Sequence, residues 1–197
     1  MIILASSSPR RADLLRQIGI PFSVVKPSTT EVAIANLNPE EMTVNIALQK
    51  AKQVSSHHKE EIVLAADTIV VFKGLIMGKP VDLQDACRML RMLSGMDHQV
   101  ITGFVLLNAC NGLIRQAAAT TTVWMEPMTD REITEYAETG DPLDKAGAYG
   151  IQGRAAVFIR KIDGCYFNVV GLPLNKFYYC YKEISDAINR RRSCNDS

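Results

Sequence analysis

The chain has 197 residues, which is enough for a single domain that buries roughly 70% of its surface when it folds. Its 22 lysines and arginines nearly balance its 21 aspartates and glutamates, and the net charge of +1 argues against a nucleic-acid-binding or membrane-surface protein. No apolar run approaches the roughly 20 residues of a membrane-spanning helix, and no signal peptide is visible. Five scattered cysteines without a CxxC pair favour a reduced, cytoplasmic protein without structural zinc.

The segment LASSSPRRADLL (4–15) links a short apolar strand to a helix. Ser8 suits the N-cap of this helix and Pro9 its first turn. Capping explains these two residues but not Arg10 and Arg11, because the helix dipole disfavours positive charge at an N-terminus. Serine hydroxyls, backbone N–H groups and two guanidinium groups would suit a polyanion such as a triphosphate. The segment therefore has two interpretations, a capped turn and an anion-binding site.

The chain then alternates between strands and helices, without an internal repeat or a low-complexity linker. Asn38 and Pro39 supply the N-cap and first residue of a helix. The run IVLAADTIVVF (62–72) is too continuously apolar for a half-exposed strand and is typical of a central, buried one. Strands are expected at 2–5, 22–26, 62–72, 99–108 and 113–123, and further helices after GKP (78–80), over 130–139 and from about 174 to 188.

Three segments in the second half of the chain lack a simple helix or strand pattern. Residues 140–153 are rich in glycine and form a loop of a length that is usually functional or disordered. Two apolar runs on either side of Asp163 and Gly164 predict a hairpin over 155–170. Residues 190–197 are expected to be a basic, disordered tail after a single domain at 1–189, and their arginines fit a solvated helix end better than a nucleic-acid patch.

Asp67 is the only charged residue in the strand at 62–72. An aspartate in an apolar strand costs several kcal/mol unless it is paired, bound to a metal ion or placed at the edge of a cleft. A structural partner would explain it, and so would a carboxylate that binds a divalent cation or accepts a proton from water. Glu31 could supply a second carboxylate, although a glutamate in a polar loop is ordinarily just solvated.

Three lysines are candidates for phosphate binding. Lys50 lies at the edge of the apolar face of its helix, Lys79 lies between a glycine and a proline, and Lys145 lies in the glycine-rich segment. Each could equally be an ordinary surface lysine. With Arg10 and Arg11 they carry enough positive charge to neutralise a triphosphate, provided that the fold brings them together.

Other common catalytic patterns are missing from the sequence. There is no Walker A motif, no GxGxxG and no GxSxG, so a P-loop enzyme, a Rossmann enzyme and a serine hydrolase lose their main support. His57 and His58 have no third ligand nearby, and His98 follows a turn between apolar elements. Metal binding by histidine is therefore not expected.

Four blocks, in order along the chain, resemble the Maf family of septum-formation-inhibitor-like nucleoside triphosphate pyrophosphatases. They are LASSSPRRADLL (4–15), AADTIVVFKGLIMGKP (65–80), LSGMDHQVITG (93–103), and DKAGAYGIQG (144–153) with NVVGLPL (168–174). The resemblance implies that the first block is a phosphate-binding turn. It also implies an α/β fold with a mixed, twisted sheet, flanking helices and two lobes around a central cleft, similar to inosine triphosphate pyrophosphatase.

The implied reaction is hydrolysis of a nucleoside triphosphate to the monophosphate and pyrophosphate with Mg²⁺ or Mn²⁺. The resemblance makes Asp67 the proton acceptor, Lys79 and Glu31 further catalytic residues, and Asp67 and Glu31 the metal ligands. Family members often carry two neighbouring acids where this chain has Thr30 and Glu31. With the serines and cations above, the expected phosphate-binding residues are Ser6, Ser8, Arg10, Arg11, Lys50 and Lys145.

The resemblance assigns base specificity to Arg10, Thr68 and Gln152. The family branch selective for 7-methyl-GTP typically has tryptophan, glutamine and glutamate there, a set that suits a cationic purine. The amide of Gln152 instead matches uracil or thymine, so we expect dTTP and UTP as substrates, with CTP as a further one. The resemblance also implies a homodimer, and it leaves open a nucleotide-binding regulator of cell division with little catalysis.

Overall fold

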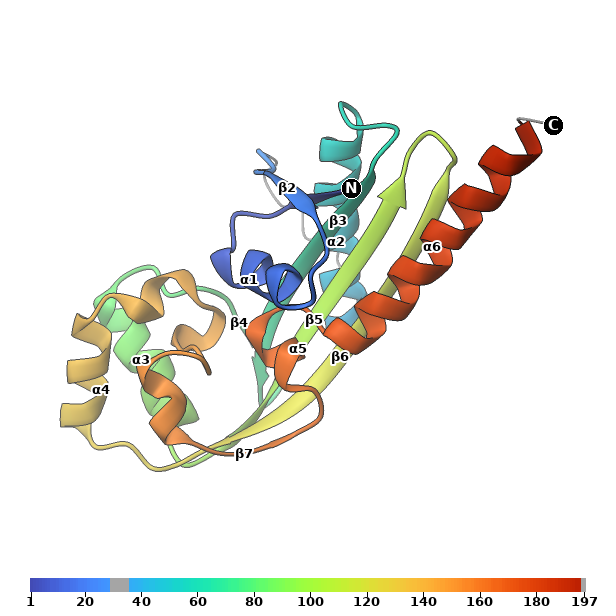
Figure 1. Ribbon diagram of the computed structural model, residues 1–197. Coiled ribbons are helices and arrows are strands. Elements are labelled where there is room, and N and C mark those ends of the chain that lie inside the picture. The colour runs from blue at the N-terminus through green and yellow to red at the C-terminus, as the bar shows by residue number, and fades with distance from the viewer. Residues whose placement is uncertain (29–35, 196–197) are drawn as a thin grey trace. The chain divides into compact units, whose positions relative to one another are not determined.

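The computed structural model describes residues 1–28 and 36–195 (Figure 1). Its strands are β1 (Ile2–Ala5), β2 (Phe22–Val25), β3 (Ile62–Phe72), β4 (Leu75–Met77), β5 (Asp97–Asn108), β6 (Leu113–Met125) and β7 (Ile159–Asp163). Its α-helices are α1 (Pro9–Gln17), α2 (Pro39–Ser55), α3 (Leu83–Leu93), α4 (Asp130–Glu138), α5 (Tyr166–Val170) and α6 (Leu174–Asn195). The 3-10 helices η1 (Asp141–Asp144) and η2 (Ala146–Ala148) occupy much of the segment expected to be a loop, and a third, η3 (Arg154–Phe158), lies at the start of the expected hairpin.

The strands form one mixed sheet in the order β2-β1-β3-β5-β6-β7, with β4 paired to β3. β1 runs parallel to both β2 and β3, whereas β3 with β4 and β6 with β7 are antiparallel. The predicted α/β fold with a mixed sheet is therefore confirmed. By internal contacts the chain forms two compact units: unit 1 comprises Met1–Asp67, Thr102–Ala118 and Gly171–Ser197, and unit 2 comprises Thr68–Ile101 and Ala119–Val170.

In unit 1, α2 packs its apolar face on the sheet. Ala47, Ala51 and Val54 contact buried residues of β1, β3 and β5, because small side chains let the helix lie close to the strands. The closest approach is at Gly103 of β5, where an added Cβ would lie 2.5 Å from the backbone nitrogen of Val44. Only a residue without a Cβ fits there, so Gly103 sets the distance between α2 and β5.

The long helix α6 completes unit 1. Phe177 of α6 is fully buried and meets Phe104 of β5 edge-on, with ring centroids 6.2 Å apart. The helix continues to Asn195 and so includes most of the segment assigned to a tail. Among the helices that the structure describes, none combines the length and apolar character needed to cross a membrane.

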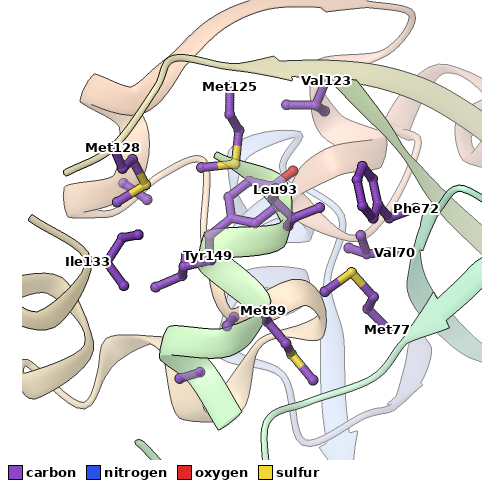
Figure 2. Close-up of a cluster of buried hydrophobic side chains, with 14 of the residues drawn as sticks. Val70, Phe72, Met77, Met89, Leu93, Val123, Met125, Met128, Ile133 and Tyr149 are labelled. Carbon is purple, nitrogen blue, oxygen red and sulfur yellow. The ribbon is translucent and has the colours of Figure 1, made fainter. Parts of the chain in front are cut away.

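In unit 2, a second core forms between β3, β5, β6 and helices α3 and α4. Figure 2 shows Leu93 of α3, Met125 of β6 and Tyr149 gathered together, and Met89 and Met77 belong to the same cluster. The apolar spacing predicted for α3 produces this arrangement, since its buried residues are Ala86, Met89, Leu90 and Leu93.

The expected hairpin over 155–170 is wrong, because only Ile159–Asp163 forms a strand and the residues before it form the 3-10 helix η3. β7 pairs with β6, and residues Tyr166–Val170 form the short helix α5 instead of a strand. Asn168 explains the difference, because its buried amide donates to the Val100 carbonyl (2.9 Å) and to Thr121 Oγ1 (2.9 Å). These long-range bonds require the Asn168 side chain to point inward from a helical turn, which overrides the local apolar pattern.

Replacing Gly103 by alanine is expected to lower the free energy of unfolding by about 1–3 kcal/mol, because the new methyl group meets backbone atoms that cannot move independently. Urea unfolding monitored by circular dichroism measures this change. Gly78→Ala is the control, since a Cβ there meets nothing within 4 Å. Equal stability of the two variants would contradict the assigned role of Gly103.

His98 predicts a pH dependence of stability. Its imidazole is buried in unit 2, Nε2 lies 2.6 Å from the Tyr149 hydroxyl, and Nδ1 has no hydrogen-bond partner among the described residues. Burial lowers the pKa of His98 to about 4 from 6.5, although nearby Asp97 acts in the opposite direction. Because the folded pKa is the lower one, His98 contributes ~3 kcal/mol above pH 6.5, and this contribution is lost as the pH falls towards 4.

Unfolding free energies measured between pH 7 and pH 4 test this contribution. The His98→Gln variant, whose side chain does not ionise, is expected to show a shallower loss of stability over this range than the parent. The exposed His57 offers a control, because His57→Gln is expected to keep the parent slope. Parallel curves for the parent and His98→Gln would contradict the interpretation.

Candidate active site

The parallel pairing of β1 and β3 brings Ser6 and Asp67 to the same edge of the sheet. Ala5, the last residue of β1, lies opposite Ala65 of β3. Ser6 follows directly after β1, and Asp67 lies two residues beyond Ala65 on the longer strand. The carboxyl ends of parallel strands are the usual place for ligand sites in α/β proteins, so this edge is the candidate site in unit 1.

Ser6 organises the turn between β1 and α1. Its hydroxyl oxygen is buried and accepts hydrogen bonds from the backbone N–H of Ser8 (3.1 Å) and from Nη1 of Arg11 (3.2 Å). Ser8 occupies the predicted N-cap position, but its side chain makes no capping hydrogen bond, contrary to the expectation of a capped helix. The Ser6 hydroxyl therefore helps to position the Arg11 side chain, and the Ser8 side chain does not cap α1.

Arg11 is held at two points. Besides its bond to Ser6, its Nε donates to the backbone carbonyl of Gly171, 2.9 Å away. This carbonyl belongs to the NVVGLPL segment at the start of α6, and no local sequence pattern predicts a contact between residues so far apart in the chain. Arg10 is half-buried in the same first turn of α1. The predicted grouping of Ser6, Ser8, Arg10 and Arg11 in one turn is therefore present in the structure.

Asp67 forms an ion pair with Lys50 of α2. Lys50 Nζ lies 2.7 Å from Asp67 Oδ1, and each side chain is only 14% exposed. A pair this shielded from water is stronger than a surface pair, and each partner keeps the other from being a lone charge in a largely apolar setting. Lys50 is therefore the structural partner that the sequence allowed for Asp67, and the functional role of this carboxylate stays a prediction.

A divalent cation fits the chemistry of Asp67 but not a site built from protein ligands alone. No group of three or more histidine, cysteine, aspartate or glutamate side chains gathers within residues 1–28 and 36–195. Magnesium in nucleotide sites is commonly held by one or two carboxylates together with phosphate oxygens of the substrate. Asp67 supplies such a carboxylate, whereas the expected second ligand, Glu31, lies outside the described residues.

Unit 2 carries the remaining predicted residues. Thr68 follows Asp67 on β3 and is half-buried, whereas Lys79 and Gln152 are exposed. The Gly78 carbonyl, next to Lys79, accepts a hydrogen bond from the backbone N–H of Gly147 (3.0 Å). The turn that carries Lys79 is therefore attached to the glycine-rich segment at 140–153.

Lys145 has all of its ammonium protons engaged. Nζ donates to the Asp141 carbonyl (2.6 Å), to Asp141 Oδ1 (2.8 Å) and to Asp144 Oδ1 (2.7 Å). A lysine has three donors and no acceptor, so this arrangement leaves none for a phosphate. Asp141 also accepts from the Tyr136 hydroxyl (2.9 Å). Burial works against ionisation of Asp141, but the hydrogen bonds from Lys145 and Tyr136 outweigh it and lower the pKa of the carboxyl.

The hydrogen-bond network around Asp141 was not predicted from the sequence, although the spacing of two of its residues indicates an ion pair. Asp141 and Lys145 are four residues apart, the spacing of an ion pair on one helical face. The glycine-rich composition obscured this spacing. The loop interpretation of 140–153 is corrected accordingly, because η1 and η2 place Asp141, Asp144 and Lys145 on one compact turn structure.

Lys50→Met is expected to lower the free energy of unfolding by about 1–3 kcal/mol, because it leaves Asp67 as a shielded, unpaired carboxylate. Adding Asp67→Asn in the same chain should recover part of this loss. Lys52→Met on the exposed face of α2 is the control and should change stability little. Denaturant unfolding of the parent, the two single variants and the double variant measures these changes. A double variant that is no more stable than Lys50→Met alone would contradict the pairing.

Comparison with known proteins places these residues in a family. The family model described as Maf-like protein matches residues 1–184. The dTTP/UTP pyrophosphatase of Carboxydothermus hydrogenoformans is 45% identical over 177 residues, 90% of this chain and 95% of that protein. The dTTP/UTP pyrophosphatase of Symbiobacterium thermophilum is 51% identical over 175 residues, 89% of each chain.

Among solved structures, the Staphylococcus aureus Ham1 protein matches with a TM-score of 0.45 and 12% identity, over 63% of this chain and 71% of that one. The family model covers both the Ser6–Arg11 turn and the Lys50–Asp67 pair, and the two relatives extend over most of the chain. The chain belongs to the Maf family.

Proposed function

We propose that this protein hydrolyses dTTP and UTP to the monophosphate and pyrophosphate. The observation that carries the proposal is the Lys50–Asp67 pair at the carboxyl edge of β1 and β3, beside the turn that holds Arg11. Relatives named dTTP/UTP pyrophosphatase at 45% and 51% identity support the substrate class.

The first part of the proposed mechanism is phosphate binding in unit 1. Arg11 is fixed by the Gly171 carbonyl and the Ser6 hydroxyl, so its guanidinium group is oriented before substrate arrives. The N-terminus of α1 adds the positive end of its dipole, with no acidic residue in the first turn to oppose it. Arg10 and the hydroxyl of Ser8 extend the same surface, and we propose Lys79 as a further catalytic residue.

The second part is activation of water by Asp67. The carboxylate removes a proton as the water oxygen forms a bond to the α-phosphorus, and the bond from that phosphorus to the bridging oxygen breaks, so that pyrophosphate leaves with its electron pair. Lys50 fixes Asp67 in place through the 2.7 Å bond. A divalent cation, Mg²⁺ or Mn²⁺, would be held by Asp67 and the phosphate oxygens, with Glu31 as a further proposed ligand, and would neutralise phosphate charge.

The third part is selection of the base, for which we propose Arg10, Thr68 and Gln152. The Gln152 amide can accept from N3–H of uracil or thymine with its oxygen and donate to a neighbouring carbonyl with its nitrogen. Guanine offers two adjacent donors on that edge and mismatches half of the amide. CTP fits less well than UTP on the same grounds, and 7-methyl-GTP is expected to be a poor substrate.

We also propose a cytoplasmic location, no nucleic-acid partner and a homodimer. Cys87 and Cys165 are thiols rather than disulfides, as a reducing compartment favours. The net charge of +1 supports the absence of a nucleic-acid partner. The homodimer rests on the family resemblance alone.

The proposal predicts release of pyrophosphate from dTTP and UTP in the presence of Mg²⁺ or Mn²⁺, faster than from GTP or 7-methyl-GTP. Asp67→Asn should reduce kcat by at least about a hundredfold, the lower range of a general base, and should retain the parent's circular dichroism spectrum. Asp13→Asn, an exposed carboxylate of α1, is the matched control and should keep full activity.

A coupled pyrophosphate assay across the common nucleotides measures both effects. Equal kcat for the folded Asp67→Asn variant and the parent would overturn the role of Asp67. If the parent binds nucleotides tightly but does not hydrolyse them, the proposed enzymatic activity is wrong and a nucleotide-binding regulator is favoured.

A further inference from the structure

The turn that carries Gln152 lies directly on the half-buried ion pair between Lys145 and Asp141. The backbone N–H of Gly153 donates to the carbonyl of Gly150 (3.1 Å), which closes a four-residue turn with Gln152 at its third position. An added Cβ at Gly150 would lie 2.6 Å from Cε of Lys145, and one at Gly153 would lie 2.8 Å from Oδ2 of Asp141. Each end of the turn therefore packs against one partner of the Lys145–Asp141 pair.

Tyr136 connects the same pair to the turn by hydrogen bonds. Its hydroxyl donates to Asp141 Oδ2 (2.9 Å) and is itself hydrogen-bonded by the backbone of Gly150. Tyr136 is buried in the core of unit 2, and the Lys145 side chain is 11% exposed. The turn therefore contacts Tyr136, which is part of the core of unit 2, and the largely shielded side chain of Lys145.

The charge balance of the network also separates it from a phosphate site. Lys145 brings one positive charge, and Asp141 and Asp144 bring two negative charges within 2.8 Å of its Nζ. A triphosphate that approached Lys145 would meet a group whose three donors are taken and whose neighbours carry net negative charge. Phosphate contact is the less favourable use of this lysine.

We propose that Lys145, Asp141 and Tyr136 are positioning residues that hold the Gly150–Gly153 turn and so fix the Gln152 amide for selection of the base. This inference rests on the proposed function, in which Gln152 reads the pyrimidine. The three side chains touch the turn and not the substrate. Their loss should alter the discrimination between bases and leave the binding of the phosphate chain unchanged.

Lys145→Met and Asp141→Asn test this assignment. Methionine keeps a stem of similar length against Gly150 and removes the ammonium group, and asparagine keeps the shape of Asp141 without its charge. Each variant is expected to lower kcat/KM for UTP about tenfold, as for one misplaced hydrogen bond, and to leave kcat/KM for GTP unchanged. The double variant should be no worse than either single one, because both changes release the same turn.

Inorganic triphosphate, which has no base, separates the two roles of Lys145. Its inhibition constant against UTP hydrolysis should be the same in the parent and in both variants. A constant that rises in Lys145→Met alone, with an unchanged ratio of UTP to GTP activity, would overturn the proposal and make Lys145 a phosphate ligand. Arg131→Met is the matched control, since it breaks an exposed 2.7 Å ion pair with Glu135 on α4 and should change neither quantity.

Amide hydrogen exchange tests the inference apart from activity. Peptides that contain Gly150–Gly153 should exchange faster in Lys145→Met and Asp141→Asn than in the parent, and peptides from α3 should not. Parent rates in the turn of both variants would overturn the proposal even if the protein hydrolyses UTP. A parent that releases no pyrophosphate from UTP or dTTP, together with faster exchange in the variants, would overturn the proposed function and the role in base selection but keep the support of the turn.

Discussion

The ion pair between Lys50 and Asp67 is the constraint on which the candidate site depends. An aspartate in β3 is compatible with folding because a cation lies 2.7 Å away, and the same cation fixes the position of the carboxylate. The Lys50–Asp67 pair is therefore required both for the stability of the fold and for the proposed role of Asp67. A well-packed apolar pair would hold α2 and β3 together at less electrostatic cost, but it would provide no group able to take a proton from water.

This pair depends in turn on how closely α2 approaches the sheet. Lys50 reaches Asp67 because Ala47 and Ala51 pack on the strands and because Gly103 leaves room for the backbone of α2. The β1–β3 register then decides what lies beside Asp67, since pairing of Ala5 with Ala65 puts the Ser6 turn at the same edge. A one-residue change in that register would separate the proposed phosphate-binding turn from the proposed base.

Much of this could be predicted from the sequence because the relevant signals are local. A lone charge in the apolar run 62–72 identifies Asp67, and the Ser8-Pro9 pair locates the start of α1. What could not be predicted depends on distant parts of the chain. The Lys50–Asp67 pairing requires the packing of α2, the Arg11–Gly171 bond joins residues 160 positions apart, and the helix at Tyr166–Val170 is set by bonds from Asn168 to β5 and β6.

The basic residues expected at the site differ in which groups surround them in the structure. Composition and motifs put five cations near a triphosphate, but a cation helps to bind phosphate only where its donors can turn towards the ligand. The Gly171 carbonyl and the Ser6 hydroxyl fix the direction of the Arg11 guanidinium group. Lys145 faces two carboxylates that cancel its charge. The carboxylates that take up the donors of Lys145 are brought to it by the fold of the segment around it, so the spacing of basic residues along the chain cannot reveal which cations are already engaged.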